Sequence, residues 1–63
     1  MKLSKETLHE LQEEKLILII TESNFTYKGQ IVSYGEDYIK FLDKYNTQRF
    51  ITLDEIKLVE VIK

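Results

Sequence analysis

The chain lacks cysteine, proline and tryptophan, and it contains only one histidine and two glycines among its 63 residues. Without cysteine it has neither a disulfide nor thiolate chemistry, and His9 alone falls short of the several ligands that a structural zinc site needs. A domain of this size buries only about 60% of the surface that its unfolded chain exposes. Because such domains are usually completed by a disulfide, a metal or a partner subunit, we expect a homo-oligomer.

The sequence also lacks a long apolar segment and an excess of positive charge. Its longest apolar run, residues 16–20, is far shorter than the roughly 20 residues of a membrane-spanning helix, and no apolar signal core follows the first residues. Lys and Arg number 9 against 11 Asp and Glu, so the net charge of −2 argues against a strongly basic surface for duplex nucleic acid. We therefore expect a cytoplasmic protein with no membrane contact.

The first segment, residues 1–14, is typical of one short amphipathic helix. Ser4 is a suitable N-cap, and Leu3 and Leu8 occupy the two positions of a hydrophobic staple. Leu8 and Leu11 form a narrow apolar stripe opposite several glutamates. Since a helix of this length is not stable alone in water, we expect it to cover the strands that follow.

From residue 16 onward the composition changes to β-branched and aromatic residues, which favour strands. Gly29 interrupts the second strand and indicates a bulge, a sharp bend or a close backbone approach. The alternation of the third strand turns Ile39 and Phe41 inward. The predicted strands are residues 16–21, 25–34, 38–43, 48–53 and 56–62.

This order of elements predicts a mainly β fold, in which a short N-terminal α-helix precedes a small five-stranded, strongly bent antiparallel barrel of the SH3-like kind. The barrel spans residues 16–62. The sequence contains no linker, low-complexity stretch or internal repeat, so residues 1–63 are expected to form a single domain.

Two segments resemble the motifs of a known family. Residues 27–34 resemble the aromatic-x-Gly-x-aliphatic core of the first Sm motif, and residues 50–56 stand where the second Sm motif falls. The whole chain is therefore similar to the Sm-like superfamily, which includes the Sm, LSm and Hfq proteins, although residues 52–54 replace the Arg-Gly of Sm proteins. The resemblance implies a ring in which the fourth strand of one subunit pairs with the fifth strand of the next.

One window, residues 38–50, combines cations with aromatic rings. It contains Lys40, Lys44 and Arg49 against the single carboxylate of Asp43. Planar side chains that stack on bases, with cations near the phosphates, bind single-stranded RNA without a basic surface overall. The candidate RNA-binding residues are Tyr38, Lys40, Tyr45 and Arg49, with Tyr34 and Thr52 as secondary candidates. Each of them also has an ordinary structural explanation, as a half-buried barrel residue or a solvated strand position.

The sequence contains no nucleophile–base pattern, no glycine-rich phosphate loop and no dinucleotide motif, so we expect neither an enzyme nor a cofactor. The favoured function is that of a non-catalytic Sm-like or Hfq-like ring that binds single-stranded RNA. Two alternatives stay open. One is an SH3-like module that binds a protein through a strand edge or its tyrosine-rich face, and the other is an Sm-like ring without RNA binding.

Overall fold

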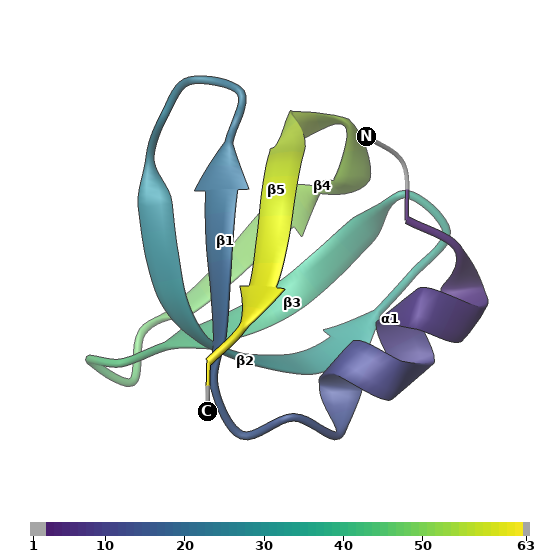
Figure 1. Ribbon diagram of the computed structural model, residues 1–63, viewed down its shortest axis with the longest axis horizontal. Coiled ribbons are helices and arrows are strands. Elements are labelled where there is room, and N and C mark those ends of the chain that lie inside the picture. Colours follow the sequence, from purple (N-terminus) through teal and green to yellow (C-terminus); the bar gives the residue numbers. More distant parts are fainter. Residues whose placement is uncertain (1–2, 63) are drawn as a thin grey trace.

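The computed structural model describes residues 3–62 and shows a mainly β fold with one short helix (Figure 1). The elements, in chain order, are α1 (Lys5–Gln12), β1 (Ile17–Thr21), β2 (Thr26–Tyr34), β3 (Tyr38–Asp43), β4 (Gln48–Thr52), the 3₁₀ turn η1 (Leu53–Glu55) and β5 (Ile56–Val61). The five predicted strands are confirmed, with boundaries that differ by at most one residue. Residues 1 and 2 of the predicted helical segment lie outside the described residues.

All five strands belong to one antiparallel sheet with the order β4-β3-β2-β1-β5. The last strand returns to the first, so that Val59 lies opposite Ile19. The sheet bends strongly, and β3 and β4 pass behind β1 and β5 in the view of Figure 1. Because β4 and β5 are the two edges of this order, strand pairing within the described residues leaves the sheet open.

The core consists of aliphatic side chains gathered around Phe41. Ile39 and Phe41 are both fully buried, which confirms the inward face predicted for the third strand. The other buried hydrophobic residues come from the helix, the strands and η1: Leu8, Ile17, Ile19, Ile31, Ile51, Leu53 and Ile56. The helix therefore contributes directly to the core of the sheet.

Helix α1 lies against β2 and is fixed at both of its ends. Its N-cap is Ser4, as predicted, because the Ser4 hydroxyl accepts a hydrogen bond from Thr7 N at 3.2 Å. Leu8 inserts into the core and is completely buried. In the last turn, Gln12 Nε2 donates to Val32 O at 2.7 Å and ties the helix to β2. Two further side chains of this segment pack against the core: Leu3 and Leu11.

A glycine and a bulge shape β2. A Cβ atom built on Gly29 would lie 2.8 Å from Asp43 Cα and 2.9 Å from the carbonyl carbon of Leu42, so the glycine permits a close approach of the β3 backbone. The β2–β3 register then shifts between Ile31 and Ser33. The bulge therefore lies beyond the glycine, and the first half of β2 is held tightly against the end of β3.

Candidate functional site

An exposed group of aromatic and polar side chains lies on β3 and β4. The strand register places Tyr38 opposite Thr52 and Lys40 opposite Phe50. Side chains alternate along a strand and Ile39 points into the core, so these four residues share the solvent-facing side of the sheet. We call Tyr38, Lys40, Phe50 and Thr52 the outer patch.

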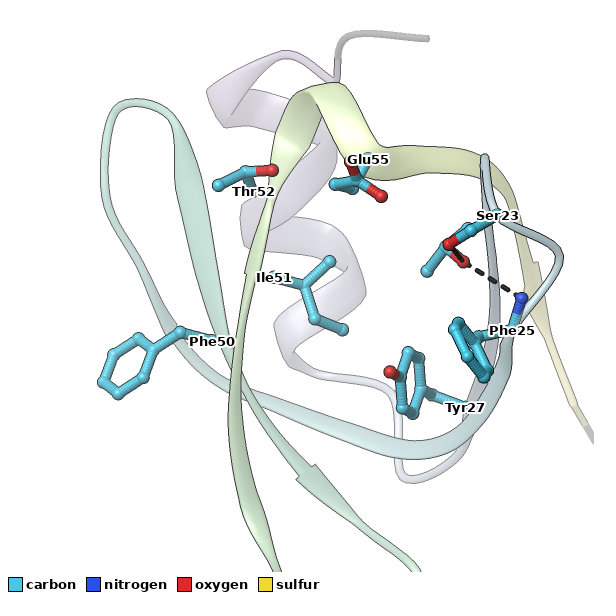
Figure 2. Close-up of a pocket in the computed structure, with 8 residues that line it drawn as sticks. Ser23, Phe25, Tyr27, Phe50, Ile51, Thr52 and Glu55 are labelled. Atoms are coloured by element: carbon cyan, nitrogen blue, oxygen red, sulfur yellow. Dashed lines mark hydrogen bonds between the residues drawn. The ribbon is translucent and has the colours of Figure 1, made fainter.

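The outer patch presents two rings and one cation. The ring centroids of Tyr38 and Phe50 are 5.9 Å apart with an interplanar angle of 54°, and Lys40 Nζ lies 6.0 Å from the Phe50 centroid. Phe50 is 70% exposed and Tyr38 is 39% exposed. In Figure 2, the ring of Phe50 lies on the opposite side of β4 from Ile51 and Tyr27. Exposed rings beside a cation form a surface on which a planar ligand can stack.

Gly35 supports the ring of Tyr38 from the turn that precedes β3. A Cβ atom at position 35 would lie 2.8 Å from two atoms of the Tyr38 ring, so the ring covers the glycine directly. Gly35 N also donates a hydrogen bond to Tyr38 O at 2.9 Å. The position of Tyr38 in the outer patch therefore depends on the missing side chain at residue 35.

A second group of aromatic and charged residues surrounds the turn between β3 and β4. It lines a cavity of about 170 Å³ that we call the turn pocket. The Arg49 guanidinium carbon lies 5.3 Å from the Tyr27 ring centroid, and Lys44 Nζ lies 5.1 Å from that of Tyr45. The residues that line the pocket are Thr26, Tyr27, Lys28, Asp43, Lys44, Tyr45 and Arg49.

Asp43 organises this turn. Its Oδ1 accepts hydrogen bonds from the backbone N–H groups of Tyr45 at 2.9 Å and Thr47 at 3.0 Å, and its Oδ2 accepts one from Arg49 Nε at 3.0 Å. The backbone N–H of Thr47, together with Arg49 and the N–H of Tyr45, lowers the pKa of Asp43, although desolvation acts in the opposite direction. The carboxylate of Asp43 is thus ionised and engaged by protein donors.

A third feature is a cavity of about 240 Å³ beside the unpaired edge of β4, which we call the edge cavity. Ile51, Phe25 and Tyr27 point toward it in Figure 2. Phe25 N donates to Thr21 Oγ1 at 3.1 Å and fixes the turn on its far side. The remaining lining residues are Ser23, Phe50, Thr52 and Glu55. The edge cavity is thus an opening beside the core that no strand among residues 3–62 covers.

Charge is separated along β3. The turn before β3 contains Glu36 and Asp37, and η1 contributes Asp54 and Glu55 beside it, because Leu53 N donates to Asp37 O at 2.8 Å. The opposite end of β3 leads into the turn pocket, with its two lysines and one arginine. The cations of the turn pocket therefore lie at the opposite end of β3 from these four carboxylates.

The six candidate residues from the sequence fall into different places. Tyr38, Lys40 and Thr52 belong to the outer patch, whereas Tyr45 and Arg49 belong to the turn pocket. The sixth candidate, Tyr34, is half-buried and packs against the core. The structure therefore divides the predicted set between two surfaces at different positions on the hairpin.

Several residues of these surfaces were missed by the sequence analysis. Lys44 and Phe50 lie within the window of cations and aromatic rings, residues 38–50, and that composition could have identified both as candidates. Tyr27 and Lys28 are distant in sequence, and they reach the turn pocket because Lys44 N donates to Lys28 O at 2.9 Å where β2 meets β3. Only the strand register could have identified them.

Comparison with known proteins finds no family model that matches this chain and no significant match among curated proteins. Among residues 3–62, no group of three or more His, Cys, Asp or Glu residues is placed to hold a metal ion. Over the same residues, no helix is long and apolar enough to cross a membrane. Any functional assignment therefore rests on the geometry of the two surfaces and of the edge cavity.

Proposed function

We propose that the protein is a non-catalytic, Sm-like RNA-binding protein that forms a homo-oligomeric ring and binds single-stranded RNA on the β3–β4 hairpin. One observation supports this most directly: the three cation–ring contacts of the described residues all use a cation from that hairpin. The three cations are Lys40, Lys44 and Arg49. Each pairs a positive charge with an aromatic ring, and proteins that bind single-stranded RNA commonly combine these two kinds of group.

Stacking would supply most of the binding energy. A base stacked on an aromatic side chain contributes about 1–3 kcal/mol, and the outer patch and the turn pocket each offer an exposed ring. The net charge of −2 leaves little long-range attraction for phosphates, so we expect a smaller salt dependence than that of a strongly basic protein. A ring multiplies one weak site through avidity, because successive nucleotides reach successive subunits.

Ring assembly would use β4 and β5, the two unpaired edges of the sheet. Residue pairs in an antiparallel ladder alternate between hydrogen-bonded and non-hydrogen-bonded. Leu53 N donates to Asp37 O, so the Phe50–Lys40 pair is a non-hydrogen-bonded one, and the backbone N–H and C=O of Phe50 point away from β3. In the β1–β5 ladder the same alternation turns the backbone groups of Val59 away from β1. Both edges thus offer free backbone groups to a neighbouring copy.

Antiparallel pairing of these two residues gives a register with complementary side chains. The register sets Phe50 beside Val59 of the next copy, Ile51 beside Leu58, and Arg49 beside Glu60. Leu58 is 42% exposed and Ile51 lines the edge cavity, so their contact would cover apolar surface on both copies. The neighbouring strand would also close the open side of the sheet and complete the Sm-like barrel.

The assembly is tested by native mass spectrometry of the wild type and of Glu60→Arg. The substitution places like charges side by side at every interface, and a cross-strand pair is worth roughly 0.2–1 kcal/mol, repeated around the ring. We expect Glu60→Arg to shift the protein toward smaller species. The matched control, Glu10→Arg on the exposed side of α1, should keep the wild-type mass. A wild type that is strictly monomeric at micromolar concentration contradicts the ring.

RNA binding is tested by fluorescence titration with oligo-U and oligo-A at two salt concentrations. We expect Tyr38→Ala to weaken binding about fivefold or more, because it removes one stacking surface. Lys40→Gln should weaken binding less, and Lys5→Gln on the helix should have no effect. If an intact oligomer binds neither oligonucleotide at low salt, the RNA proposal is wrong. A ring without RNA binding, or an SH3-like module that binds a protein, would then be favoured.

A further inference from the structure

We propose that the turn pocket is a subsite for a single nucleotide, whose base stacks on Tyr45 and whose phosphate is held by Lys28 and Lys44. This inference rests on the proposed function, because it assigns one unit of the bound RNA strand to a defined place on the hairpin. The ligand is a planar base joined to a phosphate, which either an RNA strand or a free nucleoside monophosphate supplies.

The size and walls of the pocket suit one planar ring. Its volume of about 170 Å³ is smaller than the roughly 300 Å³ at which pockets for drug-sized ligands begin. Tyr27 forms a fixed wall, because its ring packs edge-on against Phe41 at 6.5 Å between centroids and is covered by Arg49. Tyr45 is 76% exposed, so its ring is accessible to a base, with Lys44 Nζ 5.1 Å from the ring centroid. The pocket therefore combines one rigid ring with one accessible ring.

The charge of the pocket favours an anion. Asp43 is its only carboxylate, and Arg49 pairs with it in the only ion pair of the described residues. Lys28 and Lys44 therefore face the cavity without a carboxylate partner. Both lysines lie on the exposed surface, where a phosphate can reach them without a large desolvation cost.

The backbone holds the two lysines together before any ligand binds. Lys44 N donates to Lys28 O at 2.9 Å, and Gly29 pairs with Asp43 immediately beside them. The turn itself is fixed by Asn46, which adopts the left-handed conformation with φ of 64° and donates through its N–H to Asp43 O at 3.0 Å. A preorganised pocket loses less conformational entropy when it binds a ligand.

The test is an NMR titration of backbone amides with three ligands: uridine monophosphate, uridine and inorganic phosphate. A site that contacts both the base and the phosphate should bind uridine monophosphate more tightly than it binds uridine or inorganic phosphate. We expect the largest chemical shift changes at residues 44–47 and at Lys28. Oligo-U should shift the same amides and also those of the outer patch.

Three variants separate the contributions of the ring and the cations. Tyr45→Ala should weaken binding of the monophosphate by roughly 5- to 150-fold, the range expected for the loss of one base–aromatic stack. Lys28→Gln and Lys44→Gln should each weaken binding of the monophosphate and of phosphate. Lys40→Gln in the outer patch is the matched control and should leave monophosphate binding unchanged. Tyr45 is so exposed that its replacement should not affect folding.

Each outcome bears on one of the two proposals. If oligo-U binds and shifts only the outer patch, the subsite is wrong while the proposed function stands. If the monophosphate binds in the turn pocket but oligo-U does not bind the protein, the pocket is a site for free nucleotides and the RNA function is wrong. If phosphate alone binds as tightly as the monophosphate, or if no ligand shifts the pocket amides, the nucleotide subsite is refuted.

Discussion

Replacement of Gly29 by alanine tests how the first half of β2 is held against β3. The glycine lies in the middle of a strand, where alanine is ordinarily the better residue by about 0.4–1 kcal/mol through its effect on the unfolded chain. Here the added methyl group would lie 2.8 Å from Asp43 Cα and 2.9 Å from the carbonyl carbon of Leu42. Both are backbone atoms of β3, so no side-chain rotation can relieve the contact.

The magnitude follows from the two opposing effects. Overpacking of a close-packed site costs typically about 1–3 kcal/mol. Because β3 must move away from β2 as a whole, we place the cost for Gly29→Ala at the upper end of that range. After the gain from the unfolded state is subtracted, the free energy of unfolding is expected to fall by about 2 kcal/mol. For a domain of this size, a loss of that magnitude corresponds to a fall in Tm of roughly 8–16 °C.

Thermal unfolding followed by circular dichroism measures this loss. Both proteins are compared at the same protomer concentration, since assembly would change the apparent stability. The matched control is Gly35→Ala, where the added methyl group meets the ring of Tyr38, a side chain that can rotate away. That variant should lose less stability while it displaces Tyr38 from the outer patch. A Tm of Gly29→Ala equal to or above that of the wild type would refute the close approach.

Two further predictions concern the core and the turn. Leu8→Ala should lower the free energy of unfolding by about 2–5 kcal/mol in a urea titration, because Leu8 is fully buried and α1 has no other side chain in the core interior. The backbone N–H of Thr47, with Arg49 and Tyr45, lowers the pKa of Asp43 from 3.8. The ionised carboxylate therefore stabilises the folded state at neutral pH, and this stabilisation is lost as the pH falls through the lowered pKa. Asp43→Asn should therefore reduce Tm near neutral pH, and its difference from the wild type should shrink in acid; a constant difference would contradict this role.

The secondary structure could be predicted because its signals are local. The alternation of apolar residues set the inward face of β3, and the residues at the turns marked where each strand ends. Ser4 is recognisable as an N-cap because its hydroxyl acts within one helical turn. The pairing of the strands is less local: the sequence predicted an antiparallel arrangement, and the order β4-β3-β2-β1-β5 came from the structure.

The candidate site was predicted only in part, because the position of each side chain depends on register. The bulge between Ile31 and Ser33 changes which residues of β2 face β3, and no local pattern marks it. Lys28 and Lys44 meet only through the pairing of two strands. The composition of residues 38–50 therefore indicated the cations of the hairpin, but it could not show that some of these residues belong to the outer patch and others to the turn pocket.

The acidic net charge does not oppose a phosphate in the turn pocket, because the two ends of β3 are far apart on the scale of ionic screening. Six residues of strand, at roughly 3.3 Å each, place the carboxylates around Asp37 up to about 20 Å from the pocket along β3. The Debye length at physiological ionic strength is about 8 Å, so repulsion from the acidic end is largely screened at the pocket. Lys28 and Lys44 would act on a bound phosphate over a much shorter distance, where screening removes less of the attraction. The proposed nucleotide subsite is therefore compatible with a net charge of −2, because the charge is unevenly distributed along β3.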